Sequence, residues 1–490
     1  MKPRRLVPLV IGMVAGAATL AGLAMRRRET QALRTSRAQR NSELVRLGAS
    51  VGALHAGTAA RKLFASAERR TELDRDRELR TAEAVAERLG RMKGAMMKLG
   101  QMASYVDEAL PSPVRAALAE LQSNAPPMSA ELAALVIEQD FGQRPEQLFA
   151  EWDPVPIASA SIGQVHRAVI VDPETGDERA VAVKVQYPGV GEAVAADLRN
   201  ADLLGMLLAQ GFGGLDPAEM VGEIKERLVE ELDYRQEALN QQLFADFYRG
   251  HPFIHVPDVI PEFSAAHVIT TDLVVGSTWQ QLLLCPQHRR DQAGETLFRF
   301  VFRSLYGLHA FNGDPHPGNY LFHDDGRVTF LDFGLVKHFD ADEMNTFVNM
   351  VKAAAYEHDQ AAFRRVVEEA GMLRVGCPSS DAAVGEYFSQ FYESVREDKP
   401  VTWSGEYASR IVRHTFDRSS PIAQYATVPK AFVFIQRINL GLYALLGELR
   451  ATGNYRRMAE ELWPFVNGPA STPLAEAEQE WLQAAQRRDP

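Results

Sequence analysis

The sequence predicts an α+β protein with three successive parts: a helical N-terminal region, a small mixed sheet and a large helical C-terminal part. Three observations predict it. Residues 29 to about 150 are rich in Ala, Leu, Arg and Glu, with apolar residues at helical spacing. From about residue 153 the segments alternate and are rich in β-branched residues, which is typical of strands. After residue 276 helical patterning dominates again, interrupted by short strand-like stretches.

The composition is that of an ordinary globular protein with an acidic surface. Of the 490 residues, 46% are hydrophobic and 24% are charged, and the net charge is −11. An excess of negative charge disfavours contact with phosphate backbones, so we expect no nucleic acid partner. The two cysteines, Cys285 and Cys377, cannot form a disulfide framework and have no zinc-like flanks, which favours a reducing compartment for the folded part.

The N-terminus carries a segment long enough to cross a membrane. Leu6 to Met25 is a run of 20 residues without a charge, about the length that spans a bilayer as a helix. Three arginines, residues 26–28, follow it directly, which indicates a stop rather than the cleavage site of a signal peptide. We therefore expect residues 1–28 to be a single uncleaved anchor. The more basic C-terminal flank places the following domain in the cytoplasm or in an equivalent matrix-like compartment.

Two glycines in that segment have the spacing of a helix contact. Gly12 and Gly16 form a G-x-x-x-G step, which lets two helices approach closely. Spans rich in Gly and Ala also produce this step by chance. The sequence is thus compatible with a homodimer through the Gly12/Gly16 helix face but does not require one.

The expected elements follow in order along the chain. Prolines at 111, 113 and 126–127 interrupt the N-terminal helices. The stretches SIGQVHRAVIV and RAVAVKVQY alternate as strands do, and DPETGDE between them predicts a hairpin turn. The remaining expected elements are helices at 191–210 and 217–248 and strands at 267–275, 319–323 and 328–333.

The loop NGDPHPGNY, residues 312–320, contains residues suited to phosphoryl transfer. Asp314 is followed by Asn319 five positions later and by Asp332, in LDFG, thirteen positions after that. This order of Asp, Asn and the Asp of Asp-Phe-Gly is typical of kinase-like folds. Asp314 would orient or deprotonate the acceptor hydroxyl, while Asn319 and Asp332 offer the hard oxygen ligands that Mg²⁺ prefers. A lone DFG would favour a structural turn, but the three residues together favour the catalytic interpretation.

A lysine in a strand adds the cation that this chemistry needs. Lys184 lies in AVAVKV, as the phosphate-binding Lys of kinases lies in V-A-I-K. Such a lysine needs a carboxylate partner on the next major helix. Spacing alone does not choose among the four acidic residues that VEELDYRQEALNQQ offers: Glu230, Glu231, Asp233 and Glu237.

The segment PIASASIGQVH, residues 156–166, stands where a kinase has its Gly-rich loop. Only one of its residues is a glycine. The small residues at 158–161 would still let backbone N–H groups approach phosphates, without the φ > 0 freedom of glycine. We expect this altered loop to bind the nucleotide through Ala158, Ser159, Ala160, Ser161 and Gly163.

Four stretches together resemble the UbiB family of atypical, kinase-like proteins, which is associated with ubiquinone and other isoprenoid-quinone lipids. KLGQ, with the following LAELQSNAPP, matches the K-x-G-Q signature. ASASIGQVH resembles the Ala-rich loop of the family, EELDYRQEA its E-x-D signature, and GDPHPGN with LDFG its catalytic and metal loops. The match covers residues from about 93 to 337. It has two departures: Asn312 and Gly313 replace the usual His and Ala, and Ser159 stands where Ala is common.

The resemblance implies roles that the residues alone leave open. It pairs Glu237 with Lys184. It also implies that Glu231 and Asp233 form the E-x-D element and face the K-x-G-Q helices.

Lys98 and Gln101, of the K-x-G-Q signature, would then lie over the nucleotide pocket, where ordinary kinases bind a peptide. On the residues alone, Lys98 would be a surface lysine whose stem covers apolar area.

The sequence therefore predicts a protein-kinase-like bilobal α+β fold. Its parts would be a membrane anchor (1–28), a helical K-x-G-Q extension (29–150), a kinase-like N-lobe (151–275) and a largely helical C-lobe (276–490). The expected function is that of an atypical kinase or ATPase that binds Mg²⁺ with ATP or ADP at a membrane. Its partner would be a membrane lipid or quinone precursor, or a quinone-biosynthesis complex. Two alternatives stay open: a small-molecule phosphotransferase of the aminoglycoside- or choline-kinase type, and a nucleotide-binding scaffold without turnover.

Overall fold

The computed structural model describes most of the chain from residue 128 onward. The described residues are 128–160, 162–172, 175–188, 190, 232–416, 420–427 and 429–487. Residues 128–186 and 230–490 belong to one compact unit. The expected anchor at 1–28 and the expected helices at 29–127 and 191–210 lie outside the described residues.

A four-stranded antiparallel sheet begins the described part. Its strands are β1 (Glu151–Ser159), β2 (Gly163–Val171), β3 (Glu178–Gln186) and β5 (Val268–Asp272), in the order β1-β2-β3-β5. The expected hairpin is the β2–β3 pair, whose register runs without a break from Gly163↔Gln186 to Val171↔Glu178. Gly176 adopts φ +76° in the turn between them, a conformation that glycine reaches without strain.

β1 is an edge strand that the sequence pattern did not reveal. Its prolines, Pro154 and Pro156, cannot donate to a ladder and are tolerated because β1 pairs with β2 alone. The register shifts twice, between Trp152 and Pro156 and between Pro156 and Ala158. A proline-containing edge strand with bulges lacks the regular alternation on which a sequence prediction depends.

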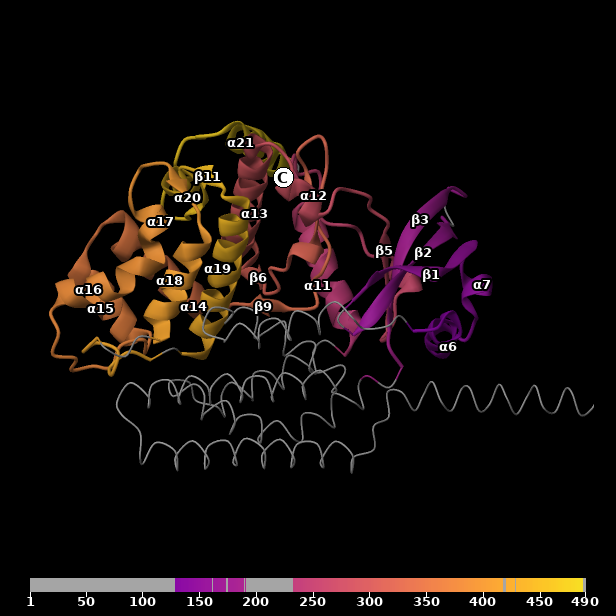
Figure 1. The fold of residues 1–490 in the computed structure, drawn as a ribbon, viewed down its shortest axis with the longest axis horizontal. Helices are drawn as coiled ribbons and strands as arrows, with labels where there is room; N and C mark the ends of the chain where they lie inside the picture. Colours follow the sequence, from indigo (N-terminus) through magenta and orange to yellow (C-terminus); the bar gives the residue numbers. More distant parts are fainter. Residues whose placement is uncertain are drawn as a thin grey trace, which may run out of the picture. The chain divides into compact units, whose positions relative to one another are not determined.

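Two helices cover one face of this sheet (Figure 1). α6 (Ala130–Phe141) and α7 (Pro145–Leu148) follow directly on the first described residues, and Ser129 caps α6. Ala133, Val136 and Ile137 of α6 share a buried cluster with β2 and β3. Residues 128–150, predicted to belong to the helical extension, therefore pack on the sheet.

The rest of the unit is mainly helical, as the sequence predicted for the region after residue 276. α11 (Tyr234–Phe247) precedes β5, and α13 (Gln287–Leu308) and α19 (Lys430–Leu449) pack against each other in the largest core. The other helices are α12 (Trp279–Leu283), α14 (Ala341–Val351), α15 (Gln360–Glu369), α16 (Asp381–Ser389), α17 (Glu393–Arg396), α18 (Gly405–Phe416), α20 (Tyr455–Leu462) and α21 (Pro473–Gln486).

Short strands frame the loops of this helical part. β4 (Ile254–His255), β8 (Val328–Phe330) and β7 (Tyr320–Phe322) form one small sheet, and β6 (Ala310–Asn312) pairs with β9 (Val336–His338). A third small pair joins β10 (Val401–Thr402) to β11 (Thr452–Gly453). The β4–β8–β7 sheet and the β6–β9 pair fix the ends of the two loops that carry Asp314 and Asp332.

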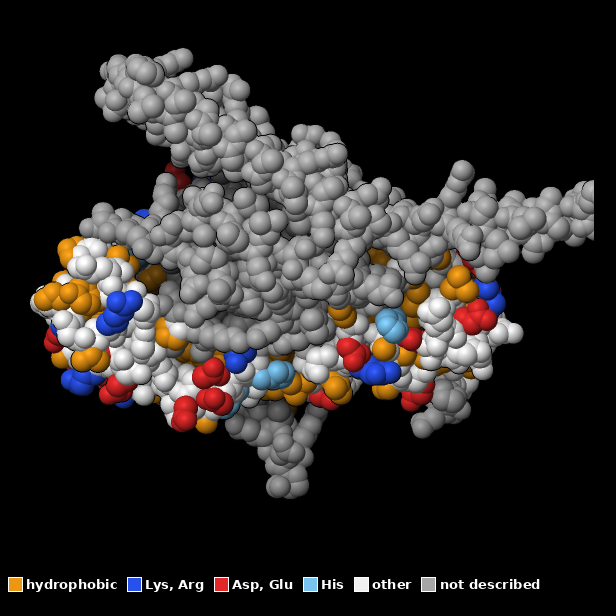
Figure 2. Space-filling model, turned by 90° about the horizontal axis from the view of Figure 1, so that it is seen from below, with side chains coloured by type: hydrophobic (Ala, Val, Ile, Leu, Met, Phe, Trp, Pro, Cys, Tyr) orange, Lys and Arg blue, Asp and Glu red, His pale blue; other side chains and the backbone are white. Residues whose placement is uncertain are grey.

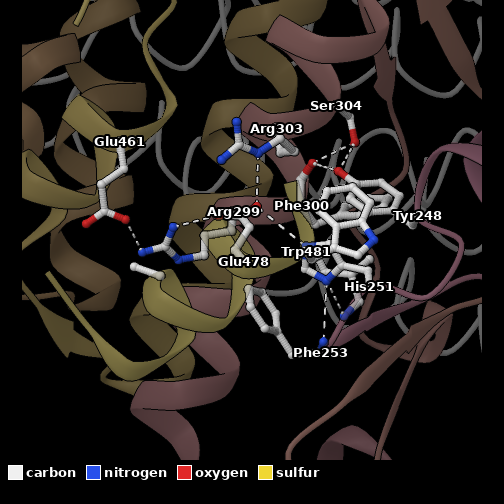
Figure 3. A network of polar contacts seen from close by, with 12 residues as sticks. Tyr248, His251, Phe253, Arg299, Phe300, Arg303, Ser304, Glu461, Glu478 and Trp481 are labelled. Carbon is white, nitrogen blue, oxygen red and sulfur yellow. Dashed lines mark hydrogen bonds and ion pairs between the residues drawn. The ribbon is translucent and has the colours of Figure 1, made fainter. Parts of the chain in front are cut away.

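A buried ion-pair network joins three of the helices (Figure 3). Arg299 of α13 is fully buried and donates to Glu295 at 2.7 Å, to Glu461 of α20 at 2.6 Å and to Glu478 of α21 at 2.9 Å. Arg303 donates to the other oxygen of Glu478 at 2.9 Å. We call Glu295, Arg299, Arg303, Glu461 and Glu478 the Arg299 cluster.

No helix among the residues that the structure describes has the length and hydropathy of a membrane span. The expected span at Leu6–Met25 is not among those residues. Figure 2 shows acidic, basic and hydrophobic side chains interspersed over the visible part of the described surface.

Candidate functional site

The site is built around Lys184 on β3. Val183 and Val185, on either side of it in the strand, are fully buried in the cluster shared with α6, so Lys184 projects from the opposite face of the sheet. Its Nζ donates to Glu237 Oε1 at 2.7 Å and to Oε2 at 2.9 Å. The structure thus places the Lys184 ammonium against one of the four acidic residues that spacing left open.

The start of α11 positions Glu237. Asp233 is the N-cap of this helix, and its side chain accepts a hydrogen bond from Arg235 N at 3.0 Å. Glu237 follows in the first turn and is only 5% exposed. Tyr234 lies beneath the lysine, with Nζ 5.1 Å from the ring centre.

Gly163 makes this close packing feasible. A Cβ at this position would lie 2.4 Å from Val185 O and 2.8 Å from the hydroxyl of Tyr234. Any side chain here would therefore push β2 away from β3 or displace the ring under Lys184.

A second carboxylate approaches Lys184 from the loop between β8 and β9. Asp332 Oδ2 lies 3.5 Å from Nζ, and Asp332 Oδ1 accepts a hydrogen bond from Gly334 N at 3.0 Å. Burial by itself lowers the pKa of Lys184, but the negative charges of Asp332 and Glu237 outweigh burial and hold this pKa well above its ordinary value. Lys184 is therefore a permanent cation.

The loop between β6 and β7 brings the other two candidate residues together. Asp314 is 6% exposed, and Asn319 Nδ2 donates to its backbone O at 3.0 Å and to its Oδ2 at 3.4 Å. His316 caps the short 3-10 helix Pro317–Asn319 by accepting a hydrogen bond from Gly318 N at 3.1 Å. His316 thus shapes this loop.

The donor atoms of this site suit a hard divalent cation. The amide nitrogen of Asn319 is committed to Asp314, which leaves its carbonyl oxygen as the atom that can face a metal. Asp332 keeps 27% of its side chain exposed beside Lys184. Mg²⁺ is commonly held by one or two such oxygen ligands and completed by water and substrate phosphates. Asp332 and Asn319 therefore fit the Mg²⁺ that the sequence predicts at this position.

The altered loop is formed by the end of β1, the start of β2 and the turn that joins them. Ala158 pairs with Val165, which pairs with Lys184 on the next strand, so the loop is connected to the lysine through the sheet register. Ala158 and Ser159 are exposed, and Ala160 N donates to Gly163 O at 2.9 Å. In this conformation the amide of Ala160 is engaged in closing the turn, while Ser161 lies outside the described residues.

The residues expected from the K-x-G-Q and E-x-D elements are mostly outside the described part. This holds for Lys98, Gln101 and Glu231. Asp233 is described and exposed, and the contact that the structure gives it is the N-cap of α11.

Two asparagines near the site were not identified from sequence as site residues. Asn312 contacts the backbone of both Asp314 and Asp332, and Asn240 contacts the backbone of Phe333. The replacement of His by Asn312 was a visible signal in the sequence, whereas Asn240 is one of several amides on its helix.

Comparison with known proteins agrees with this geometry. Residues 120–367, just over half of the chain, match the ABC1 atypical kinase-like domain. Similar proteins include the mitochondrial atypical kinase COQ8B of Rattus norvegicus, 34% identical over 56% of this chain and 51% of the relative. The mitochondrial atypical kinase COQ8 of Saccharomyces cerevisiae is 25% identical over 78% of this chain and 76% of the relative. The chain thus spans about half the length of the rat relative.

A solved structure is similar over most of the chain. The complex of Rv3197 with erythromycin from Mycobacterium tuberculosis has a TM-score of 0.58 and 30% identity. It covers 81% of this chain and 100% of its own. These findings confirm the kinase-like α+β fold and the resemblance to the UbiB family that the sequence predicted. The chain belongs to the family of ABC1 atypical kinase-like proteins.

Proposed function

We propose that this chain is an atypical kinase or ATPase that binds ATP or ADP with Mg²⁺ and supports the biosynthesis of ubiquinone or another isoprenoid-quinone lipid. The observation that carries the proposal is the ion pair of Lys184 with Glu237, with Asp332 3.5 Å from the same ammonium group. A strand, a helix and a loop distant in sequence converge there, and this arrangement is the one that phosphoryl transfer uses.

Each residue has a role that follows from its chemistry. Lys184, held by Glu237, would neutralise the phosphates of the nucleotide. Asp332 and Asn319 would hold Mg²⁺, which supplies charge neutralisation for the transferred phosphoryl group. Asp314 would orient the attacking hydroxyl or water and accept its proton. The loop at residues 158–163 would cover the phosphates.

The lipid assignment rests on the family and on the N-terminus. Relatives are named mitochondrial COQ8 kinases, and the family resemblance implies quinone lipids. The uncharged run at 6–25 would anchor the catalytic part beside such substrates. Lys98 and Gln101 would block a peptide site, which favours a lipid-like acceptor over a protein hydroxyl.

The membrane part of the proposal has its own test. Deleting residues 1–28 should leave nucleotide binding unchanged and release the protein from membranes. If the truncated protein still sediments with membranes after a high-salt wash, the anchor lies elsewhere, because attraction through an Arg-rich flank alone is screened by salt.

One observation favours the alternative of a small-molecule phosphotransferase. The similar mycobacterial structure was solved with erythromycin, a hydroxyl-rich small molecule. Under this alternative the same Asp314, Asn319 and Asp332 would transfer phosphate to a soluble acceptor.

One experiment separates these functions. Full-length protein is assayed for binding and hydrolysis of ATP alone, with vesicles containing a polyprenyl phenol, and with erythromycin; Asp314→Asn is the control. Hydrolysis that the phenol vesicles stimulate, and that Asp314→Asn loses, supports the proposal. Phosphate transferred to erythromycin supports the alternative, and binding without hydrolysis indicates a scaffold. Absence of any nucleotide binding contradicts all three.

A further inference from the structure

The loop that carries Asp332 is held through its backbone by two side-chain amides. Asn312 Nδ2 donates to Asp332 O at 2.6 Å, and Asn240 Nδ2 donates to Phe333 O at 3.2 Å. These are consecutive carbonyls in a segment that has no regular secondary structure, residues 331–335. Each carbonyl therefore accepts a hydrogen bond from a side-chain amide, in place of the backbone N–H that a neighbouring strand would supply.

Asn312 connects this loop to the loop of Asp314. It ends β6 and pairs with Val336 of β9, so its backbone is fixed beside the segment that it holds. While Nδ2 donates to Asp332 O, Oδ1 accepts a hydrogen bond from Asp314 N at 3.2 Å. Because the NH₂ group of the side chain can only donate and its carbonyl oxygen can only accept, these two contacts fix the orientation of the Asn312 amide.

Asn240 connects the same loop to the helix of Glu237. It lies one turn after Glu237 on α11 and is 5% exposed. Its Oδ1 faces Nε2 of His338 at 3.3 Å and accepts a hydrogen bond from Gln236 Nε2 at 3.4 Å, which leaves Nδ2 for Phe333 O. One turn further, Phe244 packs against the ring of Phe333 with centroids 4.9 Å apart.

We propose that Asn240 and Asn312 are a pair of positioning residues that hold Asp332 at a fixed place between the Lys184–Glu237 pair and Asp314. The inference rests on the proposed nucleotide and metal site and adds to it the means by which three separate elements act together. Groups that orient a metal ligand affect metal affinity strongly, commonly 10- to 100-fold on mutation. Asn312 stands where the family pattern has His, so this chain uses an uncharged amide for the contact.

The test removes each amide and compares it with a matched neighbour. Asn312→Leu and Asn240→Leu keep the approximate volume and lose the donor. Gln241→Met is the control, because Gln241 is also buried on α11 and donates to a backbone carbonyl, that of Pro257 at 2.8 Å, away from the site. Asn312→His tests rescue, since an imidazole N–H can donate to the same carbonyl.

Two readouts are measured for each variant. The first is hydrogen–deuterium exchange of the peptide covering residues 331–336 in protein free of metal and nucleotide. The second is the Mg²⁺ concentration that gives half-maximal binding of ADP. We expect faster exchange and roughly a tenfold higher Mg²⁺ requirement in both Leu variants, little change in Gln241→Met and partial recovery in Asn312→His.

The outcomes separate this inference from the proposed function. Equal exchange and an equal Mg²⁺ requirement in wild type and both Leu variants overturn the positioning role while the function stands. If all four variants change alike, the effect is general destabilisation and the inference is also wrong. If wild type itself binds no Mg²⁺–ADP, the proposed function fails, and the exchange readout still decides whether the two amides hold the loop.

Discussion

The Lys184 site and the Arg299 cluster both set a cation between carboxylates of different elements, and they differ in how closed they are. In the Arg299 cluster the guanidinium is fully buried and bonded to Glu295, Glu461 and Glu478. At the Lys184 site, Lys184 pairs with both Glu237 and Asp332, and the Asp332 side chain remains 27% exposed. A closed cluster fixes helices, whereas an open one with excess negative charge can accept a further cation.

The two cations also differ in whether they can exchange a carboxylate partner for a ligand. Burial lowers the pKa of Arg299, yet its three carboxylate partners raise that pKa above the ordinary value, so its charge is permanent and satisfied within the protein. Lys184 is equally cationic, but a nucleotide phosphate could replace Asp332 as its partner while Asp332 turns to a metal. This difference predicts which substitutions affect stability and which affect ligand binding.

The largest expected effect is on the closed cluster. Arg299→Met should destabilise the fold by about 3–5 kcal/mol, because it leaves the buried carboxylates of Glu295 and Glu461 without their cation, while Glu478 keeps Arg303. The measurement is unfolding in urea. The control is Arg457→Met, which removes an exposed arginine paired with Asp398 and should cost far less. An equal loss in the two variants would contradict the structural role of the Arg299 cluster.

The same change at the open site should affect binding. Lys184→Met should weaken ATP affinity by about 1.5–3 kcal/mol, roughly 10- to 150-fold, because a charged donor to the phosphates is lost. Titration calorimetry measures this affinity. Lys337→Met is the control, since Lys337 pairs with Glu343 at 3.6 Å outside the site. ATP affinity that falls equally in both variants would argue against a phosphate contact at Lys184.

A histidine beside the Arg299 cluster predicts a dependence of stability on pH. Burial lowers the pKa of His251, whose Nδ1 accepts hydrogen bonds from Phe253 N and Ile254 N and whose Nε2 lies 3.5 Å from Glu478. Because the folded state prefers neutral His251, its contribution is complete above the ordinary pKa of about 6.5 and is lost as pH falls toward the lower folded value.

Glu478 extends this loss to lower pH. Burial raises its pKa, but His251, Arg303 and Arg299 outweigh burial and bring the pKa of Glu478 to about 2. Its contribution is therefore complete above about 4.5 and declines as pH falls toward 2. Denaturation midpoints between pH 8 and 4 should fall in wild type from about pH 6.5 downward. His251→Asn keeps an acceptor for the backbone N–H groups of Phe253 and Ile254. In this variant the loss of stability above about pH 5 should disappear, and an unchanged pH profile would exclude His251 as its source.

The smallest effect concerns the turn between β1 and β2, which we propose covers the phosphates. Ala160→Gly should loosen the turn that Ala160 N and Gly163 O close, and it should change the ratio of ADP to ATP affinity. Its cost to stability should be only about 0.4–1 kcal/mol. The measurement is both affinities together with a melting curve. A lower melting temperature with an unchanged affinity ratio would mean that the loop does not contact phosphates.

Strands with regular alternation were predictable from the sequence. The β2–β3 hairpin and β5 follow from their β-branched residues, although β5 ends at Asp272, before the predicted end at residue 275. β1 was missed because its prolines and bulges belong to an edge strand. The three-residue strands β6 and β9 were also missed, whereas the equally short β7 and β8 lie within apolar stretches that the sequence predicted as strands.

Residue types at the site were predictable, and their contacts were not. The order of Asp314, Asn319 and Asp332 identified a kinase-like site, but only the family resemblance selected Glu237 over its acidic neighbours. The N-cap at Asp233 explains that choice physically, since it sets which acidic residue enters the first turn of α11. The Arg299 cluster was invisible in sequence because Glu461 and Glu478 lie more than 160 positions from their partner.

The most direct test of the open site is the dependence of ADP binding on Mg²⁺ in wild type and in Asp332→Asn. The substitution removes the single anionic metal ligand proposed for this site and leaves neutral Asn319, so binding that requires Mg²⁺ should be abolished. A melting curve verifies that the variant is folded. We expect wild type to bind ADP tightly only with Mg²⁺ and folded Asp332→Asn to show no Mg²⁺-dependent binding. Equal affinity and equal Mg²⁺ dependence in the two proteins would contradict the assignment of a metal site to Asp332.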